Sequence, residues 1–125
     1  MITLSKEQIK RLHTIQINAT GGLNGIRDEG LLDSALASAF QTFGGTELFP
    51  STVAKIARTA YGLVSNHPFV DGNKRIGTYV MLVLLELNNI SAEFSDEDII
   101  RIGLGLADGS ITDEQLLDLI LQHVG

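Results

Sequence analysis

Cysteine is absent from the 125 residues of this sequence. Disulfide bonds, thiolate zinc sites and cysteine nucleophiles are therefore excluded. The three histidines are dispersed along the chain, and so few imidazoles do not predict a dedicated transition-metal cage. A site in this protein is consequently not expected to depend on thiolate or transition-metal chemistry.

Positive charge and long apolar runs are also scarce. The 9 Lys and Arg residues stand against 15 Asp and Glu residues, and the net charge of −6 leaves no broad basic field for nucleic acid. The opening stretch, MITLSKEQIK, contains no apolar core of the signal-peptide type. The most apolar run, residues 79–85, is too short to span a bilayer. We therefore expect a cytoplasmic protein without a direct nucleic-acid partner and without a membrane partner.

Hydrophobic residues make up 44% of the sequence, which is typical of a globular protein and argues against disorder. A chain of this length buries roughly two thirds of its unfolded surface, enough for a core without covalent staples. No internal repeat, low-complexity tract or linker divides the chain. We expect one domain that covers residues 1–125.

Capping residues and apolar spacing predict about six helices and essentially no sheet, so the expected fold class is all-α. The predicted helices run from Ser5 to about Ile17, from Asp28 to Phe43, from Ser51 to about His67, from about Lys74 to Asn88, from Ser95 to about Asp108, and from Thr112 to about His123. Residues 46–49 are expected to form a short extended segment. The fourth helix is apolar on nearly all sides, which predicts that it is the central helix of the bundle.

Several side chains are expected to serve packing rather than chemistry. Tyr61 and Tyr79 lie on apolar faces of the third and fourth helices, and we assign both to the core. His13 and His123 lack chemically complementary neighbours in the sequence, which favours a surface or packing role for each. The apolar face of the first helix is expected to contain Ile9, Leu12 and Ile15.

The strongest chemical signal is the segment HPFVDGNKR at residues 67–75, between the third and fourth predicted helices. Gly72 lets backbone amides approach a ligand closely, and the residues after it enter a helix whose first N–H groups lack internal partners. Helix N-termini bind phosphate for this reason. Lys74 and Arg75 oppose the helix dipole in an otherwise acidic chain, and an anionic ligand would explain them. The alternative is that both are solvated surface charges.

Asp71 and His67 complete the chemistry of this segment. A lone carboxylate beside a phosphate site suits Mg²⁺, which prefers oxygen ligands and takes only one or two of them from protein. The alternative for Asp71 is the N-cap of the following helix, and the two roles are compatible. Imidazole is a suitable general base towards a hydroxyl nucleophile, although a lone histidine at a helix end is more often structural. Phe69 is expected to point inward and anchor the loop.

The segment HPFVDGNKR resembles the motif of the Fic/Doc family, HPFx(D/E)GNGRxxR, and is most similar to that of the Doc (death on curing) branch, which ends in NKR. Residues 21–28, GGLNGIRD, and residues 31–36, LLDSAL, also resemble the N-terminal segment of Doc proteins, so the resemblance covers nearly the whole chain. It implies a compact all-α Fic-type bundle with the motif loop at the N-terminus of the central helix. It also implies transfer of part of a nucleotide to a protein hydroxyl.

The resemblance assigns roles by position in the motif. His67 would take the proton from the hydroxyl of the target, and Asp71 would hold Mg²⁺ on the phosphates of ATP. Gly72, Asn73 and Arg75 would surround phosphate oxygens and stabilise the charge that develops on them.

Two positions depart from the wider pattern of the family. Lys74 stands where most members have a second glycine, and Thr78 stands where they have a second arginine. A lysine enters space that adenylylating members leave open for the nucleotide, and in Doc proteins the nucleotide is thought to bind in the reverse sense. The resemblance therefore places Lys74 among the catalytic and nucleotide-binding residues and implies transfer of the γ-phosphate to a serine or threonine. Transfer of AMP or another nucleotidyl group is the second hypothesis, and a non-catalytic binding role on a Fic-like fold is the third.

For the Doc branch, the resemblance implies a toxin that modifies elongation factor Tu and arrests protein synthesis. Many Fic proteins carry an inhibitory (S/T)xxxE(G/N) helix, but residues 25–30, GIRDEG, lack its hydroxyl residue, and Thr78 removes the arginine that its glutamate would meet. We infer that inhibition requires a separate antitoxin protein, which would cover an apolar groove near the loop. The segment expected to dock the target chain consists of Thr46, Glu47, Leu48 and Phe49.

Overall fold

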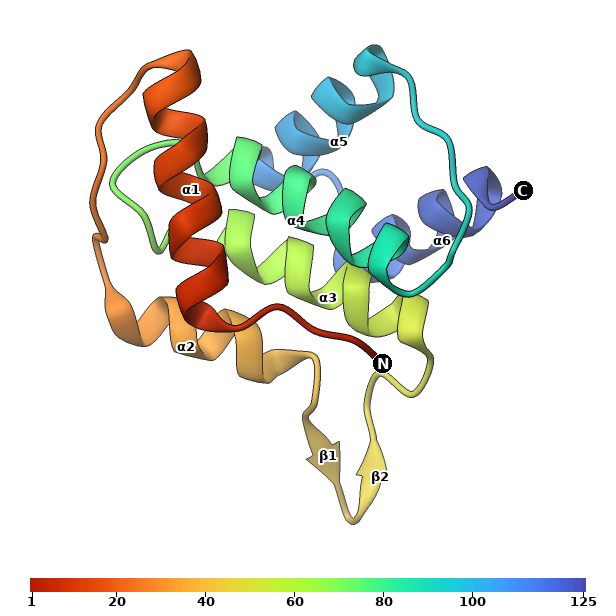
Figure 1. Cartoon of the computed structure of the whole chain (residues 1–125). Coiled ribbons are helices and arrows are strands. Elements are labelled where there is room, and N and C mark those ends of the chain that lie inside the picture. Colours follow the sequence, from red (N-terminus) through yellow and green to blue (C-terminus); the bar gives the residue numbers. More distant parts are fainter.

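Six helices and one short hairpin make up the computed structural model, which describes residues 1–125 (Figure 1). The helices are α1 (Lys6–Thr20), α2 (Glu29–Ser38), α3 (Thr52–Ser65), α4 (Asn73–Leu87), α5 (Asp96–Asp108) and α6 (Asp113–His123). The antiparallel hairpin consists of β1 (Thr42–Phe43) and β2 (Thr46–Glu47). The predicted all-α class with about six helices is confirmed.

Every helix except α4 begins at a capping residue that the sequence predicts. The side chains that accept a backbone N–H of the first turn are Ser5, Asp28, Ser51, Ser95 and Thr112. α4 begins instead at Gly72, which has a φ of 78° and makes no side-chain capping bond. The first N–H groups of α4 are therefore left without a side-chain acceptor.

The core lies between α3 and α4, which cross the middle of the molecule one above the other (Figure 1). α3 also packs against α2, α5 and α6, and α4 packs against α1 and α5, so this pair joins the other four helices. The largest fully buried side chains of the pair include Ile56, Leu63, Ile76, Val80 and Met81. The central place that was predicted for α4 is thus shared with α3.

Close packing of α3 on α4 depends on Gly77. A Cβ added to Gly77 would overlap Cγ2 of Val64 and lie 3.3 Å from the carbonyl oxygen of Ala60. We expect Gly77→Ala to lower the free energy of unfolding by about 1–3 kcal/mol through overpacking, although alanine is the better helix former. Urea unfolding measures the loss.

Gly103→Ala on α5 is the matched control for this substitution. Its added Cβ would meet Lys74 and Thr78 at 3.7 Å, which is an ordinary packing distance, so this variant should be at least as stable as the wild type. If Gly77→Ala proves equally stable, glycine does not set the distance between α3 and α4.

The second helix is shorter than predicted. The sequence predicts a helix to Phe43, but α2 ends at Ser38, and Phe43 lies in β1 with 81% of its surface exposed. The physical reason is the pair Gly44 and Gly45, whose φ angles of 58° and 82° suit a two-residue hairpin turn. Apolar spacing that continued past the end of the helix was misleading for β1. The extended segment predicted at residues 46–49 begins with β2, and this small hairpin is the whole sheet.

Two apolar side chains that were predicted to lie inside are exposed. Ile15 is 56% exposed, because the buried face of α1 carries Ile9, His13 and Ile17 and Ile15 points away from it. Tyr79 is 40% exposed, so α4 has a solvent-facing side that its apolar composition does not reveal.

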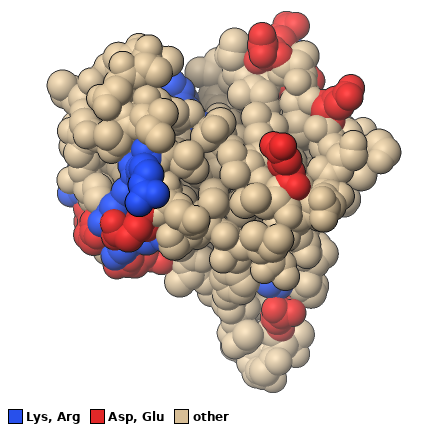
Figure 2. Space-filling model, in the orientation of Figure 1, with Lys and Arg blue, Asp and Glu red and all other residues tan.

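Charged side chains gather on the surface where α1 meets α2, as the blue and red atoms on the left of Figure 2 show. Lys6 pairs with Glu29 at 3.2 Å and with Asp33 at 2.9 Å, and Lys10 pairs with Glu29 at 2.6 Å. These partly exposed pairs contribute little stability individually, but together they connect α1 to α2. No helix combines the length and the apolar character that a membrane crossing requires.

Candidate active site

The motif segment occupies the loop between the C-terminus of α3 and the N-terminus of α4 (Figure 1). α3 ends at Ser65, because Pro68 disfavours helical geometry in the residue before it. His67 has a left-handed φ of 55°, and Gly72 has a φ of 78°. These two turns carry the chain out of α3 and back into α4.

Residues 25–28 of the α1–α2 loop pair with the motif loop like a short strand. Ile26 and Phe69 form an antiparallel bridge, and the Arg27 N–H donates to the Pro68 carbonyl at 2.8 Å. The motif loop is therefore held by a segment about 40 residues earlier in the chain.

The side chain of Arg27 fixes the end of α3 as well. Its Nε donates to the His67 carbonyl at 2.7 Å, and its Nη2 donates to the Asn66 carbonyl at 3.0 Å. Carbonyl groups at a helix C-terminus lack partners within the helix, and a cation there also complements the dipole. Sequence analysis did not identify Arg27 as a site residue, because nothing in the local pattern shows which distant carbonyls it meets.

Phe69 and His13 form the underside of the loop. Phe69 is buried, as predicted, and its ring stacks on the His13 ring with centroids 3.9 Å apart. His13 Nε2 lies 2.6 Å from the Asp71 carbonyl oxygen, and because a carbonyl only accepts, Nε2 carries the hydrogen of this bond. A surface or a packing role was predicted for His13, and its burial shows that the role is packing. Its spacing of four from Ile9 and Ile17 was the signal that it faces inward.

The Asn73 side chain holds the backbone of Phe69. Its Oδ1 accepts the Phe69 N–H at 3.0 Å, and its Nδ2 donates to the Phe69 carbonyl at 3.0 Å. Asn73 is buried, so these two bonds replace solvent contacts and lock the turn. The backbone N–H of Asn73, rather than its amide side chain, is the group at the free end of α4.

The Asp71 carboxylate is held in place by two backbone amides. Its Oδ2 accepts the Leu23 N–H at 3.1 Å, and its Oδ1 accepts the Gly72 N–H at 2.8 Å. These two hydrogen bonds, helped by the nearby Arg75 charge, lower the pKa of Asp71 below its usual value of 3.8. Gly72 is the N-cap residue of α4, so the alternative assignment of Asp71 as the N-cap was wrong.

Acid is expected to destabilise the fold through Asp71. Because its pKa is lowered on folding, its contribution to stability is fully present above about pH 4 and is lost as the pH falls through the lowered value. Wild-type protein should lose more stability than Asp71→Asn when the pH drops from about 7 to about 3, as urea unfolding at each pH would show. Equal losses would mean that other carboxylates govern the acid sensitivity.

The three basic side chains of the motif, His67, Lys74 and Arg75, form no salt bridge within the protein. His67 is exposed, and its imidazole has no hydrogen-bond partner within the protein. Neither Lys74 nor Arg75 forms an ion pair with a carboxylate. Lys74 is exposed, whereas Arg75 is partly buried and bonds through Nη1 to the Thr20 hydroxyl and the Gly21 carbonyl. Arg75 is therefore a positioned group rather than a loosely solvated charge.

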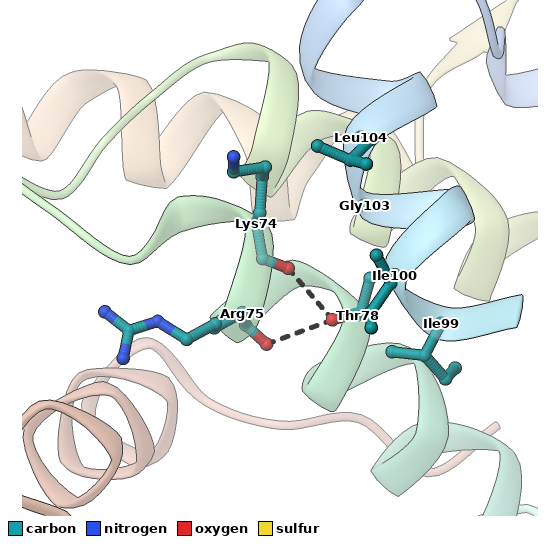
Figure 3. Close-up of a pocket in the computed structure, with 7 residues that line it drawn as sticks. All are labelled: Lys74, Arg75, Thr78, Ile99, Ile100, Gly103 and Leu104. Atoms are coloured by element: carbon teal, nitrogen blue, oxygen red, sulfur yellow. Dashed lines mark hydrogen bonds between the residues drawn. The ribbon is translucent and has the colours of Figure 1, made fainter. Parts of the chain in front are cut away.

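A pocket of about 200 Å³ opens beside Lys74 and Arg75, between α4 and α5 (Figure 3). Its remaining lining consists of Thr78, Ile99, Ile100, Gly103 and Leu104. The Thr78 hydroxyl donates within its own helix, with the Lys74 and Arg75 carbonyls at 2.9 and 3.2 Å, so it offers little to a ligand. Figure 3 shows the Arg75 side chain directed away from α5. The pocket is thus apolar on its α5 side and cationic at its end near the motif.

The predicted target-docking residues do not lie beside the motif loop. Thr46 and Glu47 form β2, Leu48 and Phe49 follow it, and all precede the N-terminus of α3, whereas the motif follows its C-terminus. The two sites are thus separated by the length of α3, about 20 Å for a helix of this size (Figure 1). Lys55 holds the segment to α3 through Glu47, at 3.0 Å, and the Phe49 carbonyl. The docking role stays a prediction.

The motif offers one carboxylate to a metal ion. No group of three or more His, Asp or Glu side chains is placed to hold a metal. Each Asp71 oxygen accepts one N–H and keeps a lone pair, which fits a hard cation that completes its shell with water and phosphate oxygens. The residues present therefore fit Mg²⁺ together with a phosphate-bearing ligand better than a metal cage made of protein alone.

Comparison with known proteins gives the family of this chain. Residues 3–85, which include α1 to most of α4 and the whole motif, match the Fic/DOC family, and the protein belongs to it. Over 72 residues the chain is 38% identical to Toxin Doc of Mycolicibacterium smegmatis, covering 58% of this chain and 55% of that protein. It is 27% identical over 127 aligned positions to Protein kinase doc of Escherichia phage P1, covering 98% of this chain and 95% of that protein.

Proposed function

We propose that this protein is a Doc-type toxin that phosphorylates a serine or threonine of a translation protein, using ATP and Mg²⁺. The observation that carries the proposal is the arrangement around the start of α4. The loop that enters α4 carries an exposed imidazole and a carboxylate fixed by two amides, two cations without a salt-bridge partner follow in the first turn, and the helix N-terminus has no side-chain cap. The phage relative named a protein kinase supports the choice of reaction.

The phosphates of ATP would lie at the N-terminus of α4. The first backbone N–H groups of α4, those of Asn73 and Lys74, would donate to a phosphate there, and Lys74 and Arg75 would add positive charge. Asp71 would hold Mg²⁺, which supplies charge neutralisation on the phosphate oxygens.

His67 would serve as the general base. It accepts the proton of the target hydroxyl while the hydroxyl oxygen forms a bond to the γ-phosphorus. The bond between the γ-phosphorus and its bridging oxygen to the β-phosphate breaks, and ADP leaves with that electron pair. Lys74 is the residue that favours this reaction over AMP transfer, because it adds a side chain to the lining of the α4–α5 pocket where the wider family pattern has glycine.

The proposed partners are an antitoxin and a protein substrate. The apolar side of the α4–α5 pocket includes Ile100, 63% exposed, and Leu104, 52% exposed, and such a surface beside the motif suits an antitoxin segment. The relative named Toxin Doc supports the assignment as a toxin. Elongation factor Tu, in the cytoplasm, is the proposed substrate on the strength of the motif resemblance.

Mass spectrometry of elongation factor Tu, incubated with the protein, ATP and Mg²⁺, tests the proposal. A phosphate-sized gain that is absent with the His67→Asn variant is expected. An AMP-sized gain would show that the protein is a nucleotidyl transferase rather than a kinase. An unmodified target, together with no binding of Mg·ATP in calorimetry, would favour a non-catalytic binding protein.

The same assay tests whether Lys74 selects the reaction. Lys74→Gly restores the residue that the wider family carries and removes a side chain that lines the α4–α5 pocket. We expect it to lose phosphoryl transfer by about tenfold or more, because one charge-assisted contact to phosphate is removed. Unchanged phosphoryl transfer would mean that Lys74 does not select the reaction.

A further inference from the structure

The loop between α1 and α2 contacts two charged side chains of the motif, Asp71 and Arg75. The Leu23 N–H donates to Oδ2 of Asp71 at 3.1 Å. This bond joins residues that are 48 positions apart in the sequence. A carboxylate that turned freely would lose side-chain entropy on binding a ligand, whereas this one is already fixed.

Gly22 is what permits that approach. Its φ is 115°, and a Cβ added to it would lie 2.7 Å from Oδ2 of Asp71 and 3.1 Å from Nη2 of Arg75. Real Cβ atoms do not approach an atom as closely as 2.7 Å, so any side chain at this position would displace the carboxylate, and it would also crowd Nη2 of Arg75 and Cδ1 of Ile17, which lies 3.1 Å away as well. Glycine at position 22 thus serves the site itself and not only the turn.

The C-terminal end of α1 holds Arg75 in a matching way. Nη1 of Arg75 donates to the Thr20 hydroxyl and to the Gly21 carbonyl, the latter at 3.2 Å. Neither Nε nor Nη2 has a hydrogen-bond partner in the protein. The contacts therefore orient the guanidinium through Nη1 alone. They leave the Nε–Nη2 edge free, and this edge can bind a phosphate in bidentate fashion.

We propose that residues 20–23 are a positioning element of the nucleotide site, which fixes the Asp71 carboxylate and the Arg75 guanidinium before ligand binds. Thr20 and the Gly21 carbonyl orient Arg75, Leu23 N–H orients Asp71, and Gly22 provides the space in which both meet. The element supplies no reacting group. Preorganised charges bind an anion more tightly than mobile ones, so its contribution should appear in nucleotide affinity. This inference rests on the proposed function, because it takes Asp71 and Arg75 as nucleotide-binding groups.

Calorimetry with Mg·ATP on folded variants tests the inference. Gly22→Ala should weaken binding by about tenfold or more, since it disturbs two charged groups. Gly109→Ala is the control: Gly109 also has a positive φ, of 83°, but its added Cβ meets nothing within 4 Å and it lies at the far end of α5. Binding by Gly109→Ala should stay within about twofold of the wild type. Equal affinities of the two variants would overturn the inference.

Thr20 provides a second test that does not strain the backbone. Thr20→Val removes the hydroxyl that accepts from Arg75 and should weaken Mg·ATP binding by about threefold to tenfold, whereas Thr20→Ser keeps the hydroxyl and should restore it. Thr20 is exposed, so neither variant should unfold the protein. Identical binding by valine and serine variants would remove Thr20 from the element.

NMR supplies a readout that needs no nucleotide. Asp71→Asn should move the amide proton resonance of Leu23, because the acceptor loses its charge, and should leave that of Leu121 in place. An unmoved Leu23 resonance would overturn the contact. If the wild type binds no Mg·ATP at all, the proposed function fails, whereas a wild type that binds and a Gly22→Ala variant that binds equally well refute the positioning element alone.

Discussion

Replacing His67 by asparagine should lower the rate of phosphoryl transfer by about 10²–10⁴-fold, the usual contribution of a positioned general base. The fold should survive, because the imidazole is exposed and has no hydrogen-bond partner within the protein. Asparagine also tolerates the left-handed φ of 55° at this position better than most residues. Single-turnover transfer to the target protein and thermal unfolding measure the two effects separately.

His123→Asn is the matched control and should give the opposite result. The His123 ring stacks on Phe94 at 4.5 Å, and Nδ1 donates to the Leu119 carbonyl at 2.8 Å, far from the motif. This variant should lose some stability and keep its transfer rate. If His67→Asn transferred phosphate as fast as His123→Asn does, His67 would not be the base.

Asn73→Ala should lower the free energy of unfolding by about 2–4 kcal/mol, because the buried N–H and carbonyl of Phe69 would both lose their partner. Asn73→Asp should also be destabilising, since its carboxylate oxygen would face the Phe69 carbonyl in place of the donor Nδ2. Urea unfolding measures both losses, and both variants should lose activity as the turn loosens.

The outcome separates two roles for Asn73. The resemblance assigns it to phosphate binding, whereas its side-chain contacts are with the loop backbone. A variant with native stability and weakened Mg·ATP binding would contradict the structural role. A variant that is destabilised but still binds Mg·ATP at low temperature, where it is folded, would support the structural role.

Local signals in the sequence predicted most helix starts and the place of the motif. Side-chain caps such as Ser95 act within one turn, so they are readable from a few residues. The first strand of the hairpin was missed because Phe40 and Phe43 continue the apolar spacing of α2, while the glycine pair after them decides the backbone. Turn chemistry outweighed periodicity there.

The supporting contacts of the site were beyond sequence reasoning for a different reason. Arg27, His13 and Leu23 meet the motif across separations of about 40 to 58 residues. Their partners are backbone carbonyls or one carboxylate, and nothing in a residue's type reveals which distant backbone group it will meet. The pocket between α4 and α5 was likewise predicted only as an apolar groove, because its lining depends on how two helices cross.

The strand-like pairing of residues 25–28 with the loop has a consequence for protein engineering. Transplanting HPFVDGNKR alone between two helices of another scaffold would carry the reactive groups but leave the Pro68 carbonyl, the Val70 N–H and the carbonyls that Arg27 binds without their partners. A working graft needs both stretches of chain at once. For the same reason, a variant that lacks residues 1–27 would keep the whole segment HPFVDGNKR and still be inactive.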